Sequence, residues 1–245
     1  MIDMEASPTR FRGLILDWGG VLTMPLDRAM ARWARRDRID IGHFRDVMSR
    51  WTGSLLPDDH RNAREACRVA APDGPPEAAE QDVASSPVHR LERGEIEASE
   101  FERELARALT ESGSPVLAEG LLDRILADLA DLHDSMVGLV ARARRAGIRT
   151  ALLSNSWGEH YPEHLWVGLF DTVVISGRVG MRKPERRIYL HTAGNLGLEP
   201  SACVMVDDLP ANIHGAVAAG MVGVLHRDVE GTRNELEALF GRSLD

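Results

Sequence analysis

The sequence predicts an α/β protein with a doubly wound parallel sheet and a helical segment inserted after the first strand. In residues 134–245, short apolar runs typical of buried parallel strands alternate with amphipathic helical stretches. One further apolar run lies at residues 12–17, and only helical patterns occur between it and residue 134. Alternating strands and helices are joined by right-handed crossovers and form parallel sheets. We therefore expect a core of residues 1–23 and 134–245, and a helical cap of residues 24–133.

The five strands expected in the core are the apolar runs at residues 12–17, 148–153, 172–175, 204–206 and 222–225. The helix before the second strand begins near residue 134 and ends at Gly147, a natural C-cap. Pro184 and Pro210 each open a helix, because proline suits the first helical turn. A last helix covers residues 232–240.

The inserted segment is rich in Arg, Glu and Ala and lacks strand-like runs. Phe101, Leu105 and Leu109 recur four residues apart and form one apolar helix face. Proline and glycine in residues 71–76 break the segment between two helices. The helices expected there cover residues 27–37, 41–52, 59–70, 77–91, 97–111 and 116–131.

Composition limits the classes of function. The chain has 245 residues, of which 44% are hydrophobic, enough for an α/β core with a smaller insert. A net charge of −9 argues against nucleic-acid binding. The two cysteines, Cys67 and Cys203, lie far apart and favour a reducing compartment. With no signal-peptide pattern and no membrane-length apolar run, we expect a cytoplasmic protein without a membrane partner, either monomer or homodimer.

Polar side chains follow the expected strands at the edge where an open parallel sheet binds its ligands. A carboxylate can attack phosphorus, and Mg²⁺ bound by carboxylate oxygens offsets the repulsion between the two anions. A hydroxyl and an ammonium group can hold the phosphoryl oxygens. The residues concerned are Asp17, Ser154, Asn155, Lys183, Asp207 and Asp208.

The order of these motifs resembles the haloacid dehalogenase superfamily, whose members are mostly phosphatases. The matching segments are residues 17–22 (DWGGVL), 153–155 (LSN), 180–184 (GMRKP) and 206–220, which begins VDD. Within the superfamily they look most similar to the N-terminal phosphatase domain of soluble epoxide hydrolases and to bacterial sugar-phosphate phosphatases. The resemblance implies a Rossmann-like core and Mg²⁺-dependent hydrolysis of a small phosphorylated metabolite.

The resemblance also assigns roles to single residues. Asp17 would be the nucleophile and a metal ligand, and Asp208 a direct metal ligand, with Asp207 acting through water or through Lys183. The Gly19 carbonyl would bind the metal, and Ser154 and Lys183 would bind phosphate and act in catalysis. Three further residues are expected beside the phosphate, Asn155, Gly19 and Trp18, although packing of Trp18 in the core is an equal alternative.

Gly19 departs from the family pattern. Active phosphatases of the family usually carry an aspartate there, which protonates the leaving group and then activates water. Such acid–base help is worth about 10²–10⁴-fold. We therefore expect a phosphatase restricted to good leaving groups, with two alternatives. One is a non-catalytic protein that binds a phosphorylated ligand or a partner, and the other is a metal-independent 2-haloacid dehalogenase.

Overall fold

The computed structural model describes residues 10–52, 86–129, 132–158, 161 and 163–244, which form two compact units. Unit 1 combines residues up to 25 with residues 129–155 and 161–245, and unit 2 combines residues 26–128 with 156–160. Some expected features lie wholly or partly outside the described residues. They are helices 59–70 and 77–91, the break at 71–76, Cys67 and the last two residues of helix 116–131.

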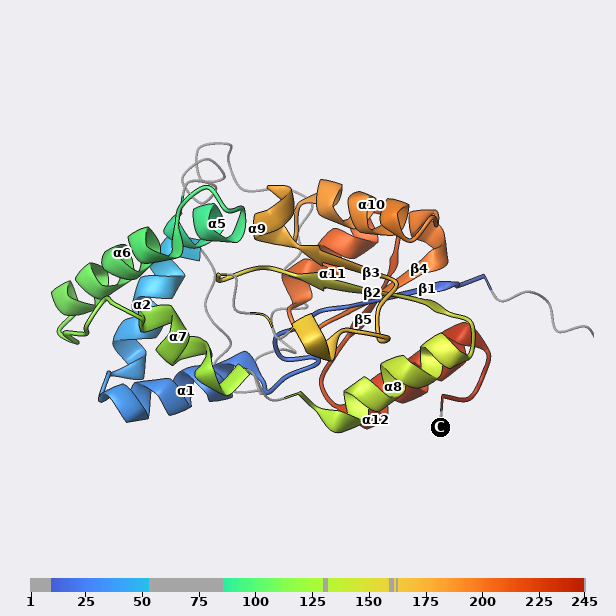
Figure 1. Cartoon of the computed structure of the whole chain (residues 1–245), viewed down its shortest axis with the longest axis horizontal. Helices are drawn as coiled ribbons and strands as arrows, with labels where there is room; N and C mark the ends of the chain where they lie inside the picture. Colours follow the sequence, from blue (N-terminus) through green and yellow to red (C-terminus); the bar gives the residue numbers. More distant parts are fainter. Residues whose placement is uncertain (1–9, 53–85, 130–131, 159–160, 162, 245) are drawn as a thin grey trace, which may run out of the picture. The chain divides into compact units, whose positions relative to one another are not determined.

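Unit 1 contains a five-stranded parallel sheet in the order β3-β2-β1-β4-β5 (Figure 1). The doubly wound fold expected from the sequence is thereby confirmed. The strands are β1 (Gly13–Leu16), β2 (Arg149–Ser154), β3 (Thr172–Ile175), β4 (Cys203–Asp207) and β5 (Val222–Leu225).

Helices cover both faces of this sheet, which explains why its strands are apolar throughout. Leu14 and Leu16 face a core shared with α8 (Asp134–Arg145) and α12 (Val229–Phe240). Ile15 faces a second core shared with α10 (Arg186–Asn195) and α11 (Pro210–Ala218). The shorter elements of the unit are α9 (Ser176–Val179), η2 (Glu163–Leu165) and η3 (Pro200–Ala202).

The strand register brings the chemically interesting residues to one edge. Leu16 of β1 pairs with Leu152 of β2 and with Val206 of β4. The Asp17 N–H then donates to the Val206 carbonyl at 3.0 Å. Parallel strands end on the same side, so the residues that follow β1, β2 and β4 converge there.

Unit 2 is helical in its described residues and has its own core, built around Trp33, Phe44 and Phe101. The expected helix 116–131 is too long, because Gly120 adopts a φ of +66° and the helix begins only after it. The helices are α1 (Leu26–Asp37), α2 (Ile41–Thr52), α5 (Pro87–Glu92), α6 (Ala98–Glu111) and α7 (Leu121–Leu126), and the short η1 (Ala127–Leu129) ends at the first residue of the next segment of unit 1.

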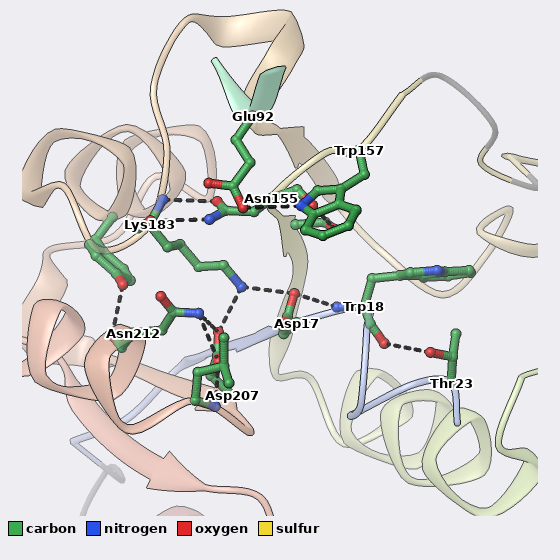
Figure 2. Close-up of polar contacts among 12 residues, drawn as sticks. Asp17, Trp18, Thr23, Glu92, Asn155, Trp157, Lys183, Asp207 and Asn212 are labelled. Atoms are coloured by element: carbon green, nitrogen blue, oxygen red, sulfur yellow. Dashed lines mark hydrogen bonds and ion pairs between the residues drawn. The ribbon is translucent and has the colours of Figure 1, made fainter. Parts of the chain in front are cut away.

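Residues 156–160 group with unit 2, whereas the sequence alone assigned them to the core. The reason is Trp157, whose ring packs against Phe101 with centroids 6.0 Å apart. Its indole N–H also donates to the Glu92 carboxylate at 3.3 Å (Figure 2).

None of the helices in the described part of the chain is both long and apolar enough to cross a lipid bilayer.

Candidate active site

Lys183 lies at the centre of the candidate site and joins two strand ends. Its Nζ lies 2.8 Å from Asp17 Oδ1, beyond β1, and 2.6 Å from Asp207 Oδ2, at the end of β4 (Figure 2). The side chain is only 1% exposed. A buried ammonium is costly unless it is paired, and here it has two carboxylate partners. The structure thus brings together three residues that the sequence proposed independently.

Asn155 positions Lys183 through the backbone of that residue. The Asn155 amide donates to the Lys183 carbonyl at 3.0 Å, and its Oδ1 accepts from the Lys183 N–H at 2.9 Å. Helix α11 approaches the same loop closely, since a Cβ added at Gly215 would lie 2.7 Å from the Pro184 carbonyl oxygen. Sequence reasoning placed Asn155 beside phosphate and missed this role, because the partner lies 28 residues further along the chain.

Asp207 is fully enclosed and has several hydrogen-bond donors. Besides Lys183, the Leu209 N–H donates to Oδ1 at 2.9 Å, and the Asn212 amide lies 3.0 and 3.1 Å from the two carboxylate oxygens. The Tyr189 hydroxyl in turn donates to the Asn212 carbonyl at 2.7 Å. These contacts fit a carboxylate that holds Lys183 in place. Asn212 lies in the motif of residues 206–220, where the sequence assigned it no role, and Tyr189 is a supporting residue that the sequence did not single out.

Trp18 contributes its backbone, and its side chain belongs to the core. The Trp18 N–H donates to Asp17 Oδ1 at 2.7 Å and so helps to orient that carboxylate. The indole is 7% exposed and packs edge-on against Tyr161 and Trp166. Of the two interpretations of Trp18, the structure thus favours core packing over contact with substrate.

The two glycines after Asp17 differ in the space around them. Gly20 has a φ of +76°, and a Cβ there would lie 2.1 Å from Asp208 Oδ2. Gly20 therefore permits the turn and leaves room for the Asp208 carboxylate. A Cβ at Gly19 would meet nothing within 4 Å. Position 19 can therefore accommodate a side chain.

Ser154 ends β2 and is 3% exposed. Its Oγ lies 2.9 Å from the Tyr161 hydroxyl, and its contact with the Asn155 carbonyl is longer, at 3.5 Å. The hydroxyl expected to bind phosphate therefore has a phenol partner that no sequence pattern indicated.

The site carries more negative than positive charge. Burial raises the pKa of Asp17 to about 7, and Asp207 adds to this effect while Lys183 opposes it. Burial likewise raises the pKa of Asp208 well above its usual value. Burial alone would lower the pKa of Lys183, but the carboxylates of Asp17 and Asp207 outweigh it and raise that pKa.

The carboxylates are arranged so that a cation could bind them. One oxygen from each of Asp17, Asp207 and Asp208 lies within 4.8 Å of the others. Three carboxylates and one ammonium leave an excess of negative charge, and hard oxygen ligands suit Mg²⁺. The donor set therefore fits a divalent ion.

Comparison with known proteins agrees with this geometry. The family model of haloacid dehalogenase-like hydrolases matches residues 11–220, which include every residue of the candidate site. The chain belongs to this family. It is a haloacid dehalogenase-like hydrolase, and its relatives include phosphatases.

Two curated relatives are similar over parts of the chain. The rat bifunctional epoxide hydrolase 2 is 30% identical over 118 residues, or 45% of this chain and 21% of the rat protein. The phosphoserine phosphatase of Thermus thermophilus is 34% identical over 131 residues, or 50% of this chain and 53% of that protein. The chain thus matches about a fifth of the first relative's length and about half of the second's.

Among solved structures, a haloacid dehalogenase family enzyme of Bacteroides thetaiotaomicron was determined in complex with magnesium and inorganic phosphate. It superposes with a TM-score of 0.55 at 18% identity, over 89% of this chain and 94% of that one. At 18% identity this similarity supports the fold of the chain and no more than the fold.

Proposed function

We propose that this hydrolase cleaves small phosphate monoesters with Mg²⁺ and uses Asp17 as its nucleophile. The observation that supports this most strongly is the pairing of Asp17 with the buried ammonium of Lys183, in a trio of close carboxylates. An ammonium beside a nucleophilic carboxylate offsets the charge of an approaching phosphate. The phosphatase relatives support the same reaction class.

Mg²⁺ would be held by Asp17, by Asp208 and by the Gly19 carbonyl. Asp207 is the weaker candidate for direct coordination, because Lys183, Leu209 and Asn212 already donate to its oxygens. When bound, the ion would neutralise charge that builds up on the phosphoryl oxygens.

In the first step a carboxylate oxygen of Asp17 attacks phosphorus, and the bond from phosphorus to the alkoxy oxygen breaks. Ser154 and Lys183 hold the phosphoryl oxygens in this step. Water then attacks the aspartyl-phosphate, which releases inorganic phosphate and restores the Asp17 carboxylate. Each step conserves the phosphoryl group, and water supplies the oxygen and protons of the products.

Gly19 determines the proposed substrate range. Without an acid at this position the leaving oxygen departs with less proton transfer, so substrates with stable leaving groups are favoured. Anomeric sugar phosphates and aryl phosphates have this property. We propose such a phosphorylated metabolite as the substrate.

We also propose a cytoplasmic setting. The thiol of Cys203, which is buried and forms no disulfide, supports it.

The test is hydrolysis of p-nitrophenyl phosphate and a panel of sugar phosphates, with and without Mg²⁺, by wild type and Asp17→Asn. We expect Mg²⁺-dependent turnover that Asp17→Asn abolishes. Activity that survives this substitution or chelation would contradict the mechanism. Stabilisation by phosphate without turnover would favour the non-catalytic binder. Halide release from 2-haloacids without Mg²⁺ would favour the dehalogenase.

A further inference from the structure

The direction of the hydrogen bond between the Ser154 and Tyr161 hydroxyls matters for phosphate binding. The two oxygens lie 2.9 Å apart, and either could be the donor. A serine hydroxyl carries one proton and two acceptor sites. If Ser154 donated to the phenol, its only proton would be used within the protein. If the phenol donates, the Ser154 proton is left for another acceptor.

Chemistry favours the phenol as donor. A phenol is more acidic than an alkyl hydroxyl, with a usual pKa of about 10, and is the better donor of such a pair. Among the described residues, the other acceptor for Ser154 Oγ is the Asn155 carbonyl at 3.5 Å, which is a long contact. The arrangement therefore leaves the Ser154 proton available at the edge of the sheet that carries Asp17 and Lys183.

Packing holds the phenol in this place. Tyr161, Trp18 and Trp166 contact one another in all three pairs, with ring centroids 6.0, 5.8 and 5.4 Å apart. Two of these contacts, those of Trp18, are edge-to-face, and aromatic pairs of that geometry are worth about 0.5–1.5 kcal/mol each. All three residues belong to unit 1, and Trp18 directly follows the proposed nucleophile. The Tyr161 ring is thus fixed by residues of the site itself.

We propose that Tyr161 is a positioning residue for the phosphoryl group. Its hydroxyl donates to Ser154 Oγ, which turns the Ser154 proton toward a phosphoryl oxygen of substrate or of product phosphate. This inference rests on the proposed function, since it takes Ser154 as a phosphate ligand. It adds to the proposed site a residue on the segment after β2, outside the four sequence motifs.

The test is Tyr161→Phe, which removes the hydroxyl and keeps the ring. We expect roughly tenfold weaker binding of inorganic phosphate, measured by calorimetry with Mg²⁺, because one hydrogen bond that orients the serine is lost. KM should rise by a similar factor while kcat changes little. The melting temperature should stay close to that of wild type, since the aromatic packing is retained.

Two further variants separate positioning from packing. In a Ser154→Ala background, Tyr161→Phe should have no further effect on phosphate binding, because the phenol acts through the serine. Trp166→Phe disturbs the packing and keeps both hydroxyls, so it should lower the melting temperature more than it weakens phosphate binding.

The inference is overturned if Tyr161→Phe binds phosphate like wild type, if its effect adds to that of Ser154→Ala, or if wild type binds no phosphate. The proposed function fails separately, if wild type binds phosphate in a Tyr161-dependent way but hydrolyses no phosphate ester.

Discussion

The ends of β1 and β4 both present an aspartate to Lys183, yet the two surroundings differ. Asp207, at the end of β4, is 0% exposed and accepts hydrogen bonds from Lys183, Leu209 and Asn212. Asp17, beyond β1, has Lys183 and the Trp18 N–H, and open space surrounds the Cβ position of Gly19 two residues on. One carboxylate is satisfied by the protein, and the other is left with capacity for a ligand. The difference indicates that Asp207 holds Lys183 in place, and it supports the proposal that Asp17 is the residue that reacts with substrate.

The largest expected effect is a difference in the free energy of unfolding between variants of the two aspartates. Asp207→Asn removes a charged partner of the buried Lys183, and we expect the free energy of unfolding to fall by about 3 kcal/mol or more. In Asp17→Asn, the free energy of unfolding at pH 8 should stay the same or rise. The pKa of Asp17 is raised to about 7, so its ionisation lowers stability as the pH rises from about 4 through 7. Urea unfolding in a chelator measures both, and equal losses in the two variants would contradict the comparison.

The next prediction fills the open space at the end of β1. Gly19→Asp places an acid where a Cβ meets nothing within 4 Å. We expect kcat/KM for alkyl phosphates to rise by about 10²-fold, because their leaving groups need a proton. The value for p-nitrophenyl phosphate should change little. Gly19→Asn, similar in size but without an acidic proton, is the matched control, and an equal gain in that variant would rule out proton transfer as the cause.

A smaller effect distinguishes the two neighbouring glycines. Gly20→Ala forces a Cβ against the Asp208 carboxylate at a φ of +76°. We expect a loss of about 1–2 kcal/mol in stability and a several-fold higher Mg²⁺ requirement for turnover. Gly19→Ala should stay within about 0.5 kcal/mol of wild type. Thermal unfolding and Mg²⁺ titration check both, and a similar response of the two variants would show that Asp208 does not depend on this turn.

The smallest expected effect is the contribution of His226, beside the end of β4, to the pH dependence of stability. The His226 N–H donates to the Asp207 carbonyl at 2.9 Å, and His226 Nδ1 lies 2.8 Å from Thr232 Oγ1. Burial lowers the pKa of His226, so the unfolded chain binds a proton more readily than the fold does. Stability from this residue is therefore present near pH 7 and is lost as the pH falls through 6.5 toward the folded pKa. His226→Gln should flatten this part of the stability curve, and an unchanged curve would exclude His226 as its source.

Much of the fold could be predicted from the sequence, because periodicity reports burial directly. The apolar runs of β1, β2 and β4 each predicted a strand covered on both faces, and the structure confirms all three. The prediction of a helix over residues 116–131 was wrong. The apolar spacing continues through Gly120, but Gly120 adopts a positive φ and the helix begins after it. Regular spacing cannot show where such a conformation interrupts a helix.

The sequence predicted which residues lie at the candidate site, but it did not predict the contacts between them. Asp17, Lys183 and Asp207 were found because each follows a strand or precedes a helix in a recognisable pattern. The roles of Asn155 and Tyr161 depend on hydrogen bonds to distant segments and on side-chain rotation, which leave no local pattern. Trp18 was ambiguous for the same reason, since one tryptophan next to a site can face either the ligand or the core.

The double hydrogen bond between Asn155 and the Lys183 backbone has a consequence for local unfolding. The Lys183 amide proton is held by a residue directly beyond β2, a central strand of the sheet. Its exchange with solvent deuterium therefore requires that this hydrogen bond to Asn155 open first. If the loop of Lys183 and strand β2 open together, the Lys183 amide should exchange about as slowly as the amides inside β2. In that case the Lys183 ammonium group would keep its place between the two strand ends until β2 itself opens.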